Sequence, residues 1–275
     1  MQAFSQWAPP GGTLGRIVGE ARERAAELAR REAELRAAAL DAPPVPSFVD
    51  AVSGGTVAVI AEVKRRSPSK GSINPGMDTG EQAAAYARGG ASALSVLTEP
   101  LHFGGAPEDL PRAGSRVSIP LLRKDFHVHR AQLFEARALG ASAVLLIVRA
   151  LAPDELEALA GEAASVGLDM LLEVRDEAEL ERALRTGAQV VGVNNRNLET
   201  LVIDPATSDR VLPLVPADRV AVWESGVSSA EDVRRAAAAG ADAVLVGSSV
   251  SAAARPEDAV RALTGVPRSE RRRRA

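Results

Sequence analysis

The 275-residue chain contains no cysteine, and this absence excludes several kinds of protein. A disulfide scaffold, a cysteine-ligated zinc site, an iron–sulfur cluster and a thiol nucleophile all need that residue. Aromatic residues make up only 3% of the chain, which argues against a surface on which nucleic-acid bases stack. The formal net charge is −3, from 33 basic and 36 acidic residues, and this balance argues against nucleic-acid binding along the whole chain.

Long hydrophobic runs are also missing. No apolar stretch reaches the roughly 18–20 residues that a membrane-spanning helix needs. The first residues, MQAFSQWAPPGG, lack the basic start and apolar stretch of a signal peptide. Hydrophobic residues nevertheless make up 46% of the chain, which is enough for a substantial core. We therefore expect a folded cytoplasmic protein that binds neither nucleic acid nor membrane.

The first 48 residues are predicted to form a helical extension. From Leu14 to about Leu40 the chain consists mainly of Ala, Leu, Glu and Arg, which are strong helix formers. Apolar residues recur along this stretch at helical spacing. The prolines of Ala42–Pro46 then stop the helix. One long helix is thus expected to lie on the fold of the remaining residues.

Beyond residue 48, short apolar runs alternate with helical stretches. Eight runs are rich in Val, Ile and Leu: Val57–Val63, Ala93–Leu97, Ile119–Leu122, Ala143–Val148, Met170–Val174, Val190–Val193, Val220–Trp223 and Ala243–Val246. Such continuous runs indicate strands that are covered on both faces. Clear helical patterns fall between them at Glu81–Arg88, Arg130–Leu139, Asp154–Ala164, Glu177–Arg185 and Ala230–Ala239. The stretches 106–116 and 204–212 show weaker helical patterns.

A repeated glycine supports a regular strand–helix architecture. Gly90, Gly140, Gly187 and Gly240 each precede Ala, at intervals of about 50 residues, and each fits the left-handed position that ends many helices. Eight strand–helix units in about 210 residues favour a closed (βα)8 TIM barrel over an open doubly wound sheet. We expect the barrel to span residues 49–267, with 1–48 as the helical extension and 268–275 as a disordered, arginine-rich tail.

Polar side chains stand at the carboxyl ends of the apolar runs, where barrels of this kind hold their active sites. Charged groups at the ends of buried strands are costly unless they are paired. For Glu62 and Lys64, two apart and so on one face of a strand, a structural ion pair is the simpler alternative. We expect six such side chains to meet at one end of the barrel, where the lysines and glutamates could serve as acid and base: Glu62, Lys64, Lys124, Glu173, Asn194 and Glu224.

Glycine and serine follow the last two runs and indicate a phosphate site. Ser225-Gly226 and Gly247-Ser248 expose backbone N–H groups and hydroxyls where barrels commonly bind phosphate. A helix that begins near Ser248 would add the positive end of its dipole. Ser67, after the first run, could complete the cradle. A plain tight turn is the alternative interpretation.

No metal site is predicted. His102, His127 and His129 lack the spacing of metal ligands and are expected in loops or at the surface. Asp125 is expected to be structural, while Arg196 either contacts the substrate or fixes its own loop.

Taken in order, these motifs resemble those of the indole-3-glycerol phosphate synthases. The resemblance runs from about residue 12 to 265 and rests on Ile60–Ser69 (IAEVKRRSPS), Ser95–Glu99 with Phe103, Leu122–Phe126 (LRKDF), Glu173-Val174, Gly192–Leu198 (GVNNRNL), Glu224–Gly226 and Gly247–Ser249. It implies a (βα)8 enzyme of tryptophan biosynthesis that closes the indole ring of 1-(2-carboxyphenylamino)-1-deoxyribulose 5-phosphate. Carbon dioxide and water are lost, and neither a metal nor an organic cofactor is used.

The resemblance also implies a role for each matching residue. Lys124 would protonate the substrate carbonyl oxygen and Lys64 would bind the anthranilate carboxylate, or the two lysines exchange roles. Glu173 would transfer protons during dehydration. An acid lysine of this kind has a pKa lowered by burial or by a nearby cation. Glu62 and Asn194 would position the sugar hydroxyls and the lysines, and Glu224 and Ser225 would line the substrate site. Phosphate would be bound by Ser67, Gly226, Gly247 and Ser248. The aromatic ring would lie in an apolar pocket formed by Phe103, Phe126, Leu145 and Ile147.

Two positions depart from the usual pattern of that family. His127–Arg130 replaces an Asp-Pro-Tyr-like continuation, which bears on the shape of the loop after Lys124. Trp223 replaces a small residue and either points outward into the helix layer or reshapes the pocket. Trp7 and the first helix either cover the barrel mouth or cap an exposed end of the barrel.

Two other functions compete with the synthase. One is another phosphate-binding barrel enzyme, such as a neighbouring isomerase of the pathway, and the other is a barrel that binds without catalysis. The extra helix and the Glu-x-Lys of the first run favour the synthase over the isomerase, and the intact Lys64, Lys124 and Glu173 argue against a binding barrel. The expected partner is a phosphorylated small molecule. The expected oligomeric state is a monomer, with a weak homodimer as the alternative.

Overall fold

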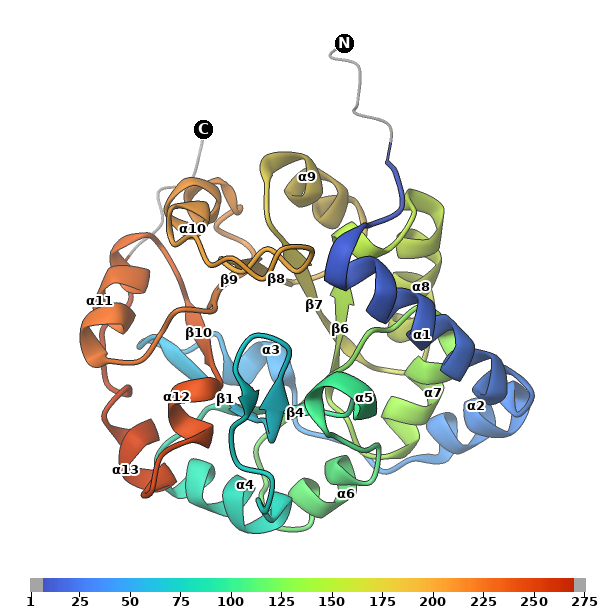
Figure 1. The fold of residues 1–275 in the computed structure, drawn as a ribbon, viewed down its shortest axis with the longest axis horizontal. Coiled ribbons are helices and arrows are strands. Elements are labelled where there is room, and N and C mark those ends of the chain that lie inside the picture. The colour runs from blue at the N-terminus through green and yellow to red at the C-terminus, as the bar shows by residue number, and fades with distance from the viewer. Residues whose placement is uncertain (1–6, 270–275) are drawn as a thin grey trace.

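A computed structural model describes residues 7–269 and shows a closed barrel of parallel strands (Figure 1). Around the barrel the strands follow the order β1-β10-β9-β8-β7-β6-β5-β4 and then return to β1. Their bounds are β1 (Ala58–Val63), β4 (Ala93–Leu97), β5 (Leu121–Lys124), β6 (Ala143–Ile147), β7 (Asp169–Val174), β8 (Val190–Asn194), β9 (Val220–Glu224) and β10 (Ala243–Val246). The predicted (βα)8 TIM barrel is confirmed.

Helices surround the strands, as Figure 1 shows. They are α1 (Gly12–Ala29), α2 (Glu32–Asp41), α3 (Phe48–Ala51), α4 (Thr79–Arg88), α5 (Pro100–Phe103), α6 (Asp109–Gly114), α7 (Arg130–Ala138), η1 (Val148–Ala150), α8 (Pro153–Ser165), α9 (Glu177–Arg185), α10 (Ala206–Val211), η2 (Leu212–Leu214), α11 (Ala230–Ala238), α12 (Ser248–Ser251) and α13 (Pro256–Arg261). A short antiparallel hairpin, β2 (Arg66–Ser67) with β3 (Gly71–Ser72), follows β1 and was not predicted. Short helices do occur in 106–116 and 204–212, as expected.

The strands are apolar because both of their faces are covered. Nearly every strand residue is buried, which explains the continuous Val, Ile and Leu runs. The third strand was predicted two residues early, at Ile119–Leu122. Pro120 has no N–H group for the ladder, and the strand begins after it and extends to Lys124. Lys124 therefore belongs to the barrel itself and not to the loop that follows.

The repeated glycines end helices in the predicted way. Gly90, Gly140, Gly187 and Gly240 have φ angles of 92°, 88°, 76° and 95°. Only glycine adopts this left-handed region at little cost. Each glycine therefore turns the chain from an outer helix back into the next strand.

The N-terminal extension is two helices, so the prediction of one long helix is wrong. The chain bends at Arg30 and Arg31, between α1 and α2. This bend lets α2 pack against α7 and bury Leu35 and Ala39. Intrinsic propensity does not predict such a break, because tertiary packing overrides it. Helix α1 lies at the barrel rim and contacts α7 and η1.

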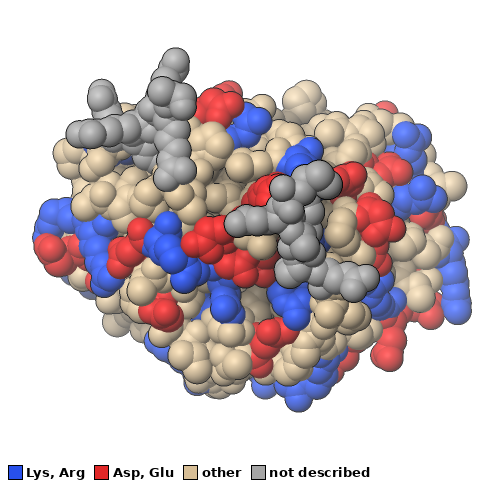
Figure 2. Space-filling view, turned by 90° about the horizontal axis from the view of Figure 1, so that it is seen from above, with Lys and Arg blue, Asp and Glu red and all other residues tan. Residues whose placement is uncertain are grey.

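Arg268, assigned to the tail by sequence, is bound to the body of the barrel. Its guanidinium donates hydrogen bonds of 3.0 and 2.8 Å to the carbonyls of Ser53 and Gly54 and pairs with the buried Asp242. The last six residues of the predicted tail, 270–275, lie outside the described part of the chain. On the face seen in Figure 2, basic and acidic side chains are interspersed and do not gather by sign.

None of the helices within residues 7–269 is both long and apolar enough to cross a membrane.

Candidate active site

A cavity of about 330 Å³ opens at the carboxyl ends of the barrel strands. All sixteen residues that the sequence singled out line it: Glu62, Lys64, Ser67, Phe103, Lys124, Phe126, Leu145, Ile147, Glu173, Asn194, Arg196, Glu224, Ser225, Gly226, Gly247 and Ser248. The closed barrel brings strand ends from distant parts of the sequence around one axis. The six charged and amide side chains that were expected to converge therefore line one cavity together with the other ten residues.

The centre of the cavity is a lysine held between two buried glutamates. Lys124 Nζ, from β5, lies 3.2 Å from Glu173 Oε2 of β7 and 3.4 Å from Glu224 Oε2 of β9. Burial by itself would lower the pKa of Lys124, but the negative charges of Glu224, Glu173 and Glu62 outweigh it and raise the pKa above its ordinary value. This direction is opposite to the expected one, because the sequence did not show how many carboxylates surround the amine. Lys124 is thus held in its protonated form.

Glu224 has the environment of a neutral acid. Burial is the largest effect, and together with the repulsion from Glu173 it outweighs the attraction of Lys124, raising the pKa of Glu224 to about 8. Its Oε1 is buried and accepts no hydrogen bond from the described residues. A Cβ atom at Gly192 of β8 would overlap this oxygen, so glycine there makes room for the carboxyl group.

Glu62 and Lys64 form a second ion pair beside the first. Both lie at the carboxyl end of β1 and, being two residues apart, point to the same side, where Lys64 Nζ donates a hydrogen bond to Glu62 Oε1. Glu62 is buried, and Lys64 is partly accessible from the cavity. A Cβ atom at Gly247, just after β10, would overlap both charged groups. The glycine of the predicted phosphate motif thus also provides the space that this ion pair occupies.

Asn194 joins the ends of β8 and β9. Its Oδ1 accepts hydrogen bonds of 2.9 Å each from the Ser225 hydroxyl and from the backbone N–H of Arg196. The Arg196 guanidinium donates to the carbonyl of Leu201, 3.0 Å away. Arg196 therefore fixes its loop, as one of the two interpretations expected, and it also lines the cavity.

One side of the cavity is apolar. The rings of Phe103, which ends α5, and Phe126, which follows β5, have centroids 6.2 Å apart. Leu145 and Ile147 of β6 continue this wall. Further apolar side chains from outside the predicted set line the cavity at other places: Leu14, Ile17, Leu97, Leu198, Leu201, Ile203, Val227 and Leu245. Such a wall suits a flat aromatic group.

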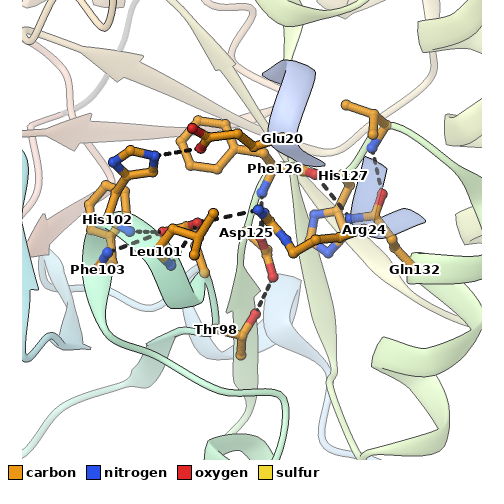
Figure 3. A network of polar contacts seen from close by, with 12 residues as sticks. Glu20, Arg24, Thr98, Leu101, His102, Phe103, Asp125, Phe126, His127 and Gln132 are labelled. Atoms are coloured by element: carbon orange, nitrogen blue, oxygen red, sulfur yellow. Dashed lines mark hydrogen bonds and ion pairs between the residues drawn. The ribbon is translucent and has the colours of Figure 1, made fainter. Parts of the chain in front are cut away.

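Helix α1 contributes to the site and does more than cap the barrel. Leu14 and Ile17 line the cavity, and polar contacts tie the helix to the loops that carry the two phenylalanines (Figure 3). Glu20 Oε2 lies 2.5 Å from His102 Nε2 of α5. Arg24 lies 3.5 Å from Glu99, which caps α5 by accepting hydrogen bonds from the N–H groups of residues 101–103.

The unusual sequence after Lys124 forms a well-bonded loop. Asp125 accepts a 2.5 Å hydrogen bond from the hydroxyl of Thr98, and it also lines the cavity. His127 lies in the loop but is buried, where its Nδ1 is 2.7 Å from the Leu145 carbonyl. Burial, assisted by Arg123, lowers the pKa of His127 to about 4. The neutral imidazole thus serves as packing, and the departure from the family pattern leaves Phe126 in the cavity wall.

The opposite side of the cavity is rich in glycine, serine and backbone N–H groups. Gly226, with a φ of 85°, follows β9, and Ser248 begins α12 after β10. Ser67, after β1, accepts a 3.2 Å hydrogen bond from the backbone N–H of Lys70. Strands β1, β10 and β9 are adjacent in the barrel, so these residues form one continuous edge. This edge has the composition of a phosphate site.

Lys70 was overlooked, although the sequence carried a signal for it. The chain contains only three lysines, Lys64, Lys70 and Lys124, and all three line this cavity. Elsewhere the chain uses arginine for its positive charges, and arginine does not release its proton at physiological pH. The scarcity of lysine is therefore the sequence feature that could have identified Lys70.

A smaller cavity of about 240 Å³ adjoins the site and shares Glu173, Asn194 and Arg196 with it. Its wall also includes Glu179 of α9, whose carboxylate accepts a 2.7 Å hydrogen bond from the N–H of Arg175. Burial, assisted by the charge of Asp176, raises the pKa of Glu179 to about 7. Between about pH 4.5 and pH 7, the Glu179 carboxyl group therefore keeps a proton in the folded protein, whereas in the unfolded chain it has lost that proton.

The Glu179→Gln variant should change how stability depends on pH. In the wild-type protein the raised pKa lowers the free energy of unfolding as the pH rises from about 4.5 to about 7, by at most about 3 kcal/mol. Glutamine does not ionise, so the variant should gain stability relative to wild type at pH 8 and show little gain at pH 5. Thermal unfolding at both pH values measures this, with the exposed Glu177→Gln as control. Equal effects at the two pH values would contradict the prediction.

Among residues 7–269, no group of three or more His, Asp or Glu side chains is placed to hold a metal ion.

The comparisons with known proteins agree with this geometry. The family model for indole-3-glycerol phosphate synthase matches residues 14–263. A protein of that name from a Nocardioides species is 51% identical over 245 residues, which are 87% of this chain and 94% of the relative. Indole-3-glycerol phosphate synthases 1 and 2 of Streptomyces coelicolor are 50% and 46% identical, covering 86% and 92% of this chain and 89% and 99% of their own lengths.

A solved structure supports the fold alone. Thiamine phosphate pyrophosphorylase from Pyrococcus furiosus superposes with a TM-score of 0.57 at 17% identity, over 76% of this chain and 94% of that protein. At such low identity a shared barrel says nothing about a shared reaction. The family match and the half-identical relatives are of a different kind, and they show that this chain belongs to the indole-3-glycerol phosphate synthase family.

Proposed function

We propose that the protein converts 1-(2-carboxyphenylamino)-1-deoxyribulose 5-phosphate to indole-3-glycerol phosphate, with loss of carbon dioxide and water. The observation that carries the proposal is the buried cluster of Lys124, Glu173 and Glu224, which lies between an apolar wall and a glycine- and serine-rich edge. Membership of the family supports the same reaction.

The two sides of the cavity suit the two ends of this substrate. The phosphate would bind at the edge formed by Ser67, Gly226, Gly247 and Ser248, after three adjacent strands. The anthranilate ring would lie along the wall of β4, β5 and β6, where Phe103 and Phe126 stand. Lys64 and Arg196 would bind the carboxylate, and Glu62 and Asn194 would orient the hydroxyl groups of the sugar chain.

Ring closure needs a proton at the substrate carbonyl oxygen. As the ring carbon that bears the carboxylate attacks the carbonyl carbon, Lys124 would donate this proton, and the oxygen becomes a hydroxyl group. Loss of carbon dioxide from the same ring carbon then restores aromaticity. The protonated carboxyl group of Glu224, 3.4 Å from the amine, would return a proton to Lys124. The high pKa of Lys124 favours this return.

Dehydration then completes the indole. The new hydroxyl group leaves as water with a proton from an acid, and the neighbouring carbon next to nitrogen loses a proton to a base. Glu173 would be this base, since its carboxylate lies 3.2 Å from Lys124. Lys124 would supply the proton that leaves with the water, so acid and base stand side by side.

The proposed function is tested by incubating the purified protein with the carboxyphenylamino substrate and following the indole fluorescence of the product. We expect saturable turnover without an added metal or organic cofactor. Absence of product at high substrate concentration would overturn the proposal. A calorimetric titration that shows product binding in a protein without turnover would instead favour a barrel that only binds. The monomeric state and the cytoplasmic location remain predictions from the sequence.

A further inference from the structure

Trp223 lies next to the active site but outside the cavity. It precedes Glu224 in β9, and because successive side chains of a strand point to opposite faces, the indole points into the layer between barrel and helices. It is buried, and the guanidinium of Arg235 on α11 lies 5.7 Å from the centroid of its ring. Arg235 in turn pairs with Asp209 of α10 at 2.6 Å. Of the two positions considered for Trp223, the outward one is therefore correct.

The residue two positions later has an unusual backbone. Ser225 has a φ of 67°, in the left-handed region. Within residues 7–269, only one other residue besides glycine, Leu201, has a positive φ. A residue with a Cβ atom is strained in this conformation and remains there only when its surroundings hold it. Glycine at 226 continues the left-handed turn with a φ of 85°.

Two side chains hold Ser225 by its carbonyl oxygen. The indole Nε1–H of Trp223 donates to this oxygen at 3.1 Å, and Nδ2 of Asn195 donates to it at 3.2 Å. Asn195 is itself held, because its Oδ1 accepts a 2.9 Å hydrogen bond from the N–H of Ser208. With the carbonyl fixed in this way, the Ser225 hydroxyl donates to Asn194 Oδ1 at 2.9 Å and lines the cavity.

We propose that Trp223 is a positioning residue of the active site. Its indole N–H holds the carbonyl of Ser225, and this contact keeps the Ser225 hydroxyl and the Gly226 N–H directed at the substrate. The indole is separated from the cavity by the strand itself, so it acts through Ser225 and not by contact with substrate. The inference rests on the proposed function for its kinetic test, whereas its structural test is independent of activity.

The kinetic test compares Trp223→Phe with Arg235→Met. Phenylalanine keeps an aromatic ring under Arg235 and removes the N–H, whereas methionine removes the cation and leaves the indole N–H in place. We expect Trp223→Phe to lower kcat/KM about five- to twenty-fold, since a lost hydrogen bond and a shifted hydroxyl both act on the bound substrate. Arg235→Met should stay within about two-fold of wild type. Equal activity of Trp223→Phe and wild type would overturn the proposal.

A double-mutant cycle distinguishes positioning from a general loss of stability. If Trp223 acts through Ser225, then adding Trp223→Phe to Ser225→Ala should lower kcat/KM by less than about two-fold further. A purely structural role would give the same fold-change in both backgrounds, and that result would contradict the proposal.

A crystal structure of Trp223→Phe provides the readout that needs no substrate. We expect Ser225 to leave the positive φ region and its hydroxyl to lose the hydrogen bond to Asn194. An unchanged Ser225 in the variant would overturn the positioning role even if the wild-type enzyme is active. Conversely, a wild-type protein without turnover would overturn the proposed function and leave this structural test valid.

Discussion

Replacement of Lys124 by alanine is expected to lower kcat by about two orders of magnitude or more, the magnitude of a lost general acid. Within residues 7–269, the amine of Lys124 is the only cationic group that hydrogen-bonds to both Glu173 and Glu224. Without it, no group of comparable placement protonates the substrate carbonyl oxygen. Initial rates of indole formation at saturating substrate measure the effect.

Charge and proton donation at this position can be separated. Lys124→Arg keeps a cation near the two glutamates, but guanidinium does not give up a proton near neutral pH. We therefore expect Lys124→Arg to be nearly as inactive as Lys124→Ala. Thermal unfolding should show that the arginine variant is folded, because its carboxylates keep a counter-ion. An arginine variant that retained more than about a tenth of wild-type kcat would rule out general-acid catalysis by Lys124.

The Glu173→Gln variant should have the second-largest effect, a fall in kcat of about a hundred-fold. Glutamine has nearly the same shape and can still accept a hydrogen bond from Lys124, so substrate binding should change little. It is not a base, however, and the dehydration step is therefore slowed specifically. In a single turnover, carbon dioxide should be released well before indole fluorescence rises.

The delay between carbon dioxide release and indole formation is the result that identifies the step in which Glu173 acts. Glu177→Gln, at an exposed position of α9, is the matched control and should release carbon dioxide and form indole as wild type does. If Glu173→Gln slowed carbon dioxide release and indole formation equally, Glu173 would act before decarboxylation, and its assignment to dehydration would be wrong.

The barrel was predictable because its signals are local. Each strand is a short apolar run, and the helix–strand junctions before β4, β6, β8 and β10 each carry a glycine at positive φ. The site was predictable for a related reason, since a charge such as Glu173 or Lys124 at the end of a buried strand has no structural purpose of its own. Each of these features can be recognised within a single short segment of the chain.

Other features depend on which segments meet. The break between α1 and α2 follows from packing on α7, and the place of Leu14 and Ile17 in the cavity wall follows from where α1 lies. Neither is marked by a residue with a special conformational preference. The same holds for His127, which is buried and contacts the Leu145 carbonyl on the next strand.

The sequence by itself determined the architecture, the family and the list of polar groups at the strand ends, because periodicity and residue type are properties of local segments. Only the tertiary structure decided how those groups affect each other. Nearby glutamates raise the pKa of Lys124 despite its burial, and burial, assisted by the charge of Glu173, raises the pKa of Glu224. Electrostatic effects depend on distance and burial, and closure of the barrel creates both.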